Sequence, residues 1–214
     1  MALAIRRYGT LAGIVAVILF FWINIPDTFM TLRNWLNISQ QVSMLAVTAF
    51  TMTIVMVMGD FDLSVGSMAS LAGIVAALAF QAGFSVPAAL ALALLVGLAG
   101  GLLNGLLVSY VGILPFVATL GTLTIFSGLA FLVSDGKTIF GRDIPESFSA
   151  FARGGIPLFR AGEQWVSLPY LTLTALVILA LVWVLLEHTV YGRSLYAIGG
   201  NAEAARLAGV RVRI

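Results

Sequence analysis

The composition of this 214-residue chain indicates a membrane protein before any motif is considered. Hydrophobic residues make up 61% of the sequence and charged residues only 9%, whereas a soluble globular protein carries about 25% charged residues. A soluble surface is therefore excluded, and the net charge of +2 gives no reason to expect nucleic acid as a partner. The lack of cysteine and the single histidine, His188, exclude disulfides, thiolate nucleophiles and multi-histidine metal centres.

Apolar segments long enough to cross a bilayer recur along the chain. A membrane-spanning helix needs about 20 residues, so the sequence predicts an all-α, polytopic transmembrane helical bundle. The first segment ends without a small-residue cleavage site, and we therefore interpret it as a retained span and not as a signal peptide. The six predicted spans lie at about residues 8–25, 38–58, 68–84, 87–110, 115–134 and 168–186.

Charges outside the spans predict the orientation. Arg6 and Arg7 precede the first span, and four more arginines lie in the polar tail of residues 188–214. Because Lys and Arg gather on the cytoplasmic side, the N-terminus and this tail are predicted to lie inside, with residues 1–187 as the transmembrane region. Six crossings place the loop of residues 135–167, which carries four cations and four acids, outside the membrane. We expect a solvated loop with room for one short surface helix.

Residues 59–67, with the sequence GDFDLSVGS, interrupt the apolar pattern with two carboxylates and two glycines. One interpretation is two separate helices joined by a short turn, with Asp62 or Ser64 as the N-cap of the second. The other is a broken helix whose unwound backbone lines a wet cavity, as in transporters. Hydroxyls in the fifth span would extend that lining, although such hydroxyls more often bond their own backbone or a neighbouring helix. The candidate translocation residues are Asp62, Ser64, Ser67, Thr119 and Thr122.

The fourth span carries Gly97, Gly101 and Gly105, which are four residues apart and so share one helix face. Glycines at this spacing let another membrane helix approach closely. The sequence leaves open whether that helix belongs to the same subunit or to a second copy in a dimer.

The polar tail contains the signals of a short helix of about two turns, bounded at both ends. Asn201 is a good N-cap residue and Gly209 a good C-cap residue. The charges of Glu203 and Arg206 suit the first and last turns, respectively. Such a helix either docks into the groove of a partner or rests on the lipid surface. Its small apolar face, at i, i+3 and i+4 spacing, consists of Ala204, Leu207 and Ala208.

Three stretches together resemble the membrane permease subunit of bacterial ABC importers for simple sugars, of the ribose and xylose type. They are residues 59–67, residues 115–122 (PFVATLGT) and residues 191–210 (YGRSLYAIGGNAEAARLAGV). The similarity extends over nearly the whole chain. Members of that family commonly show Gly-Gly-Ile-Asp-Leu-Ser in the first stretch, so Asp60 and Phe61 are departures from the family pattern.

The resemblance implies three protein partners besides membrane lipid: a cytosolic ABC ATP-binding subunit, a periplasmic sugar-binding protein and a second permease copy. ATP and Mg²⁺ would bind to the ATPase subunit, and this chain would hold no cofactor, metal or catalytic residue. Residues 188–214 would form the cytoplasmic coupling loop. Because such permeases continue through several more spans, the chain is expected to be a fragment or a truncated product. The residues expected to contact the ATPase are Gly200, Asn201, Glu203, Ala204, Ala205, Arg206, Leu207 and Gly209.

The expected function is that of a multi-pass permease component that imports a monosaccharide, such as a pentose, across the bacterial inner membrane by ATP-driven alternating access. Two alternatives stay open at this point. An inactive remnant or a membrane scaffold would follow from the lack of the later spans. An ion-coupled secondary transporter would be expected to place coupling acids within its spans, where Asp60 and Asp62 are the only candidates.

Overall fold

The computed structural model describes residues 2–162 and 164–212, with side chains in the first helix described from Tyr8 onward. A short π-helix, η1 (Leu107–Val111), extends the fifth helix, and a 3₁₀ turn, η2 (Gly141–Asp143), lies in the long loop. Two strands, β1 (Gly155–Ala161) and β2 (Gln164–Pro169), pair in one antiparallel hairpin. The α-helices are α1 (Ala2–Asn24), α2 (Pro26–Phe29), α3 (Leu32–Val57), α4 (Val65–Gln81), α5 (Val86–Leu106), α6 (Pro115–Val133), α7 (Glu146–Arg153), α8 (Tyr170–His188) and α9 (Val190–Leu207).

All six predicted spans lie on helices, namely α1, α3, α4, α5, α6 and α8. The helix α3 begins earlier than predicted because Thr31 accepts a hydrogen bond from the backbone N–H of Asn34 and caps it. The helices that are long and apolar enough to cross a membrane are Leu32–Val57, Val86–Val111, Pro115–Val133 and Tyr170–His188; shorter apolar helices are Tyr8–Asn24 and Val65–Gln81. The predicted fold class, a helical polytopic membrane protein, is confirmed.

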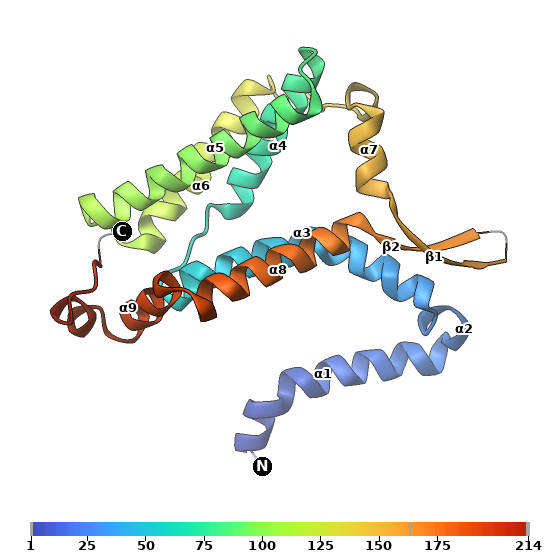
Figure 1. Cartoon of the computed structure of the whole chain (residues 1–214), viewed down its shortest axis with the longest axis horizontal. Coiled ribbons are helices and arrows are strands. Elements are labelled where there is room, and N and C mark those ends of the chain that lie inside the picture. The colour runs from blue at the N-terminus through green and yellow to red at the C-terminus, as the bar shows by residue number, and fades with distance from the viewer. Residues whose placement is uncertain (1, 163, 213–214) are drawn as a thin grey trace.

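The spans that follow the first one form two packed groups (Figure 1). In one group α3 lies along α8, and in the other α4 packs against α5 and α6. The extended segment between α3 and α4 runs from one group to the other. Many large apolar side chains are exposed on the surface of the described helices, which suits contact with lipid. Buried core clusters are formed by Val182 and Leu186 of α8 with Leu195 of α9, by Leu71, Phe126 and Ala130 in the second group, and by Ala79, Phe80 and Ala89 of α4 and α5.

The short helix α7 bridges the two groups at the end predicted to face outward. Near its start, Phe148 contacts Phe80 of α4, with ring centroids 5.4 Å apart. Near its end, Phe151 stacks on Tyr170 of α8, with centroids 5.5 Å apart and ring planes 9° from parallel. One helix of eight residues therefore holds the outer ends of both groups through aromatic contacts.

The hairpin of β1 and β2 was not predicted, although the short surface helix in this loop was. Gly155 pairs with Pro169 and Ala161 with Gln164, and the register is irregular between Pro157 and Phe159. The hairpin exists because its second strand buries Val166 and Pro169, and because α3 lies behind it. Both contacts join residues far apart in the sequence.

Candidate functional site

The helical conformation is interrupted between α3 and α4, next to a glycine. Gly59 has a positive φ of 87°, a conformation that glycine adopts without steric cost. The carboxylate oxygen Oδ1 of Asp62 then accepts hydrogen bonds from the backbone N–H and the hydroxyl of Ser64, both at 2.7 Å. Ser67 Oγ donates to the carbonyl of Ser64 at 2.8 Å. Because α3 and α4 lie in different helix groups (Figure 1), they are two separate helices, and Asp62 orders the turn that joins them.

Behind this turn lies a buried polar cluster made of Ser64, Asn104, Thr119 and Thr122. Ser64 is only 1% exposed, and its hydroxyl accepts a hydrogen bond of 2.8 Å from Nδ2 of Asn104 on α5. The hydroxyls of Thr119 and Thr122 donate to carbonyls four residues earlier in α6, at 2.8 and 3.2 Å. Thr119 also reaches the carbonyl of Phe61 at 3.4 Å. The turn is thereby tied to α5 and α6, and a role of these hydroxyls in translocation stays a prediction.

Asn104 was not among the predicted site residues, although a single amide in the apolar helix α5 was the available signal. It is buried, and its Oδ1 has no hydrogen-bond partner among the described residues. An unsatisfied buried acceptor costs about 1–3 kcal/mol. The carbonyl oxygen Oδ1 of Asn104 is therefore a hydrogen-bond acceptor without a described partner, next to the segment that separates α3 from α4.

The glycine face of α5 is open in the described part of the chain. A Cβ added at Gly97, Gly101 or Gly105 would have no described atom within 4 Å. The glycine of α5 that packs inside this chain is Gly100, where a Cβ would collide with Met68 of α4. No described residue covers this face, and its contact with a further helix stays a prediction.

The tail forms the predicted capped helix as the second half of α9. Asn201 departs from helical geometry, with φ −163° and ψ 102°, and its Oδ1 accepts a hydrogen bond of 3.0 Å from the backbone N–H of Ala204. This is the geometry of an N-cap. At the other end Gly209 has φ 86°, and Val210 N donates to the carbonyl of Ala205 at 3.0 Å, as in a glycine-capped C-terminus. Both predicted helix boundaries are confirmed.

The capped helix presents one apolar face and buries the other. Leu207 is 75% exposed, with Ala204 and Ala208 exposed beside it. Ala205, by contrast, is only 5% exposed and points into the chain's own packing. The guanidinium of Arg206 pairs with the Glu203 carboxylate at 2.6 Å, and this hydrogen bond lowers the pKa of Glu203 below its ordinary value. A partner could therefore meet Leu207 and its neighbours, but not Ala205.

The first half of α9 is seated on the end of α3. A Cβ at Gly199 would collide with the carbonyl oxygen of Val57, whereas a Cβ at Gly200 would have no described atom within 4 Å. Leu195, one turn earlier in α9, is buried against Val57 and Met58. The capped helix is thus connected, through a close backbone contact, to the last residue of α3 before the helix break.

The sequence of this chain matches a family model and several known proteins. The family model described as "Branched-chain amino acid transport system / permease component" matches residues 34–214. The chain is 33% identical over 207 residues to the ribose import permease protein RbsC of Bacillus subtilis (strain 168), covering 97% of this chain and 61% of that protein.

Two further relatives are named for other solutes. The autoinducer 2 import system permease protein LsrC of Yersinia pseudotuberculosis serotype O:3 (strain YPIII) is 37% identical, with 96% of this chain and 56% of that protein covered. The galactose/methyl galactoside import permease protein MglC of Escherichia coli (strain K12) is 36% identical, with 96% and 62% covered. The chain therefore spans about three fifths of the length of these relatives. No solved structure matches it.

Proposed function

Because this chain belongs to the family of transport permease components that its residues 34–214 match, we propose that it is the membrane-spanning part of an ATP-driven importer for a monosaccharide. The relatives named for ribose and galactose favour a sugar over an amino acid as the solute. A pentose such as ribose is the first candidate. The chain would be a transport subunit and not an enzyme.

The observation that carries the proposal is the capped helix at the end of α9. It is bounded by Asn201 and Gly209, it exposes Leu207, and it is seated on α3 through Gly199. An ATP-binding subunit on the cytosolic side would pack against the exposed apolar face, within the segment of residues 200–209. ATP and Mg²⁺ would bind to that partner.

In the proposed mechanism, closure of the ATP-binding subunits moves the capped helix, and α9 transmits the movement to the end of α3. Val57, which Gly199 contacts, comes just before Gly59 in the sequence, and at Gly59 the chain turns toward α4. Movement there would shift the two helix groups relative to each other, as alternating access requires. The polar groups of Asp62, Ser64, Ser67, Thr119 and Thr122 would then exchange their present hydrogen bonds for transient bonds to the solute.

The proposed location is the bacterial inner membrane, with the N-terminus in the cytoplasm. The hairpin and α7 would then face the periplasm, where a sugar-binding protein delivers the solute. A second permease copy would complete the translocation path, and the open face of Gly97, Gly101 and Gly105 is a candidate for contact with a further helix.

The test is capture of the ATP-binding subunit by the purified chain. Leu207→Glu places a charge on the exposed apolar face, and we expect it to abolish capture. Ala197→Glu, an exposed position in the first half of α9, is the matched control and should leave capture unchanged. Equal capture by both variants would refute the assigned face. Ala205 is unsuitable for this test because it is buried, so a change there would disturb the fold.

A further inference from the structure

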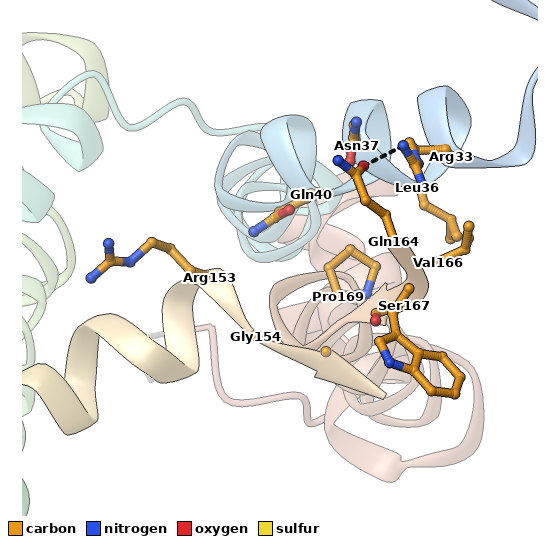
Figure 2. Close-up of a pocket in the computed structure, with 12 residues that line it drawn as sticks. Arg33, Leu36, Asn37, Gln40, Arg153, Gly154, Gln164, Val166, Ser167 and Pro169 are labelled. Atoms are coloured by element: carbon orange, nitrogen blue, oxygen red, sulfur yellow. Dashed lines mark hydrogen bonds between the residues drawn. The ribbon is translucent and has the colours of Figure 1, made fainter. Parts of the chain in front are cut away.

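A polar cavity of about 420 Å³ lies where α3, the end of α7 and the β-hairpin meet. Figure 2 shows Arg33, Asn37 and Gln40 along one side of α3, with Gln164 of β2 reaching toward them and Ser167 farther from α3, next to Pro169. The cavity lies at the end of the molecule that the charge pattern predicts to face outward. Ligand pockets for small organic molecules measure about 300–1,000 Å³, so this one is large enough for a monosaccharide.

The cationic groups of this cavity already have partners. Arg33 Nη1 donates to Oε1 of Gln164 at 2.6 Å (Figure 2). Arg153 lies 3.6 Å from the carboxylate of Glu146 and donates to the carbonyl of Ser149. No carboxylate lies among the lining residues that the structure describes. Each guanidinium group thus has a structural partner, and its remaining N–H groups can still donate to the hydroxyl oxygens of a ligand.

Three of the neutral side chains have no described hydrogen bond, and they differ in character. The side chains of Asn37, Ser167 and Trp165 make no hydrogen bond with other described residues. An amide and a hydroxyl both donate and accept, which matches the hydroxyl groups of a polyol, whereas an anion would need donors alone. Trp165 is 60% exposed and adds a large apolar surface with one N–H donor.

Burial and one hydrogen bond brace the walls of the cavity. Val166 and Pro169 are buried beneath it, and Nε2 of Gln40 donates to the carbonyl of Ala152 at 3.0 Å, which ties α3 to the end of α7. Preorganised walls reduce the entropy that a ligand loses on binding. The cavity also adjoins α7, the helix that bridges the two helix groups.

We propose that this cavity is a binding site for a neutral monosaccharide on the chain itself, lined by Asn37, Trp165 and Ser167. The proposal rests on the proposed importer function and adds to it a weak solute site at the outer mouth, in addition to the sugar-binding protein. It is distinct from the polar groups at the helix break, which lie in the other helix group.

The test measures binding of radiolabelled D-ribose and D-galactose to the purified chain in lipid nanodiscs, without any sugar-binding protein. We expect saturable binding of at least one of the two sugars. Asn37→Ala should weaken it about fivefold, which corresponds to one hydrogen bond of typical net strength. Trp165→Leu should weaken it by at least as much. Trp183→Leu, which changes a similarly exposed tryptophan on α8 outside the cavity, is the matched control and should leave binding unchanged.

Three results would overturn the site. The first is no saturable sugar binding, and the second is equal binding by the Trp165 and Trp183 variants. The third is displacement of the bound sugar by D-gluconate at a lower concentration than by the unlabelled sugar, which would make the cavity an anion site. ATP-dependent uptake is measured in parallel with the same variants. Normal uptake without direct sugar binding would refute this site alone, whereas absent uptake by the unaltered chain would refute the importer function.

Discussion

Replacement of Gly199 by alanine tests the close seating of α9 on α3, on which the proposed transmission of movement depends. The added Cβ would meet the backbone carbonyl of Val57, and a backbone atom cannot rotate away as a side chain can. Overpacking of this kind costs about 1–3 kcal/mol, and we take the upper end because the obstacle is backbone. Alanine regains up to about 1 kcal/mol of helix propensity over glycine. The net expected loss is about 2 kcal/mol.

The neighbouring residue Gly200 provides the matched control. A Cβ there has no described atom within 4 Å, so Gly200→Ala should be neutral or stabilising by up to about 1 kcal/mol. Both variants are heated in detergent, and the fraction that stays monodisperse in size-exclusion chromatography is measured. We expect Gly199→Ala to lose its fold at a lower temperature than Gly200→Ala. Equal melting of the two variants would refute the close seating of α9 on α3.

Three further predictions follow from other contacts. Asn104→Ala removes the donor to Ser64, so the turn before α4 should become more sensitive to proteolysis; the lost hydrogen bond is worth about 1 kcal/mol, and removal of the unsatisfied Oδ1 offsets part of the effect on global stability. Phe148→Ala removes one aromatic anchor of α7 and should increase cleavage of the long loop, at a cost of about 1–2 kcal/mol for this half-buried ring. The pKa of Glu203 is lowered by Arg206, so protection of the capped helix from hydrogen exchange should hold at neutral pH and fall as the pH drops through the folded-state pKa.

Each of these predictions has a result that would contradict it. Unchanged cleavage before α4 in Asn104→Ala would mean that the amide does not hold the turn. Phe116→Ala, a change at an exposed ring at the other end of α6, is the control for Phe148→Ala and should not increase cleavage. Glu203→Gln should remove the pH dependence of hydrogen exchange, and the same pH dependence in that variant would assign it to another group.

Local patterns in the sequence were sufficient to predict the helices and the caps of the tail. Runs of apolar residues predicted the six apolar helices, of which four in the described chain are long and apolar enough to cross a membrane, because membrane helices are set by length and composition. Asn201 and Gly209 were recognisable because an N-cap and a C-cap depend on a few neighbouring residues. The same reasoning failed to separate the glycines. Gly199 and Gly200 look alike in the sequence, and only the approach of α3 distinguishes them.

What the sequence could not predict depends on contacts between distant segments. Asn104 is 40 residues from its partner Ser64, and Arg33 is 131 residues from Gln164. The glycines at positions four apart in α5 indicated a packed face, yet Gly100 is the one that packs on α4 within the described chain. Helix periodicity shows which residues share a face, but it does not show which face meets a neighbour.

The importer function is tested most directly by uptake of radiolabelled D-ribose and D-galactose into proteoliposomes that contain the chain together with its ATP-binding subunit and sugar-binding protein. We predict uptake of at least one sugar that requires ATP and Mg²⁺ on the side of the ATP-binding subunit and persists in the presence of a proton ionophore. Uptake that is independent of ATP and abolished by the ionophore would identify an ion-coupled transporter instead. No uptake of either sugar under these conditions would contradict the proposed function.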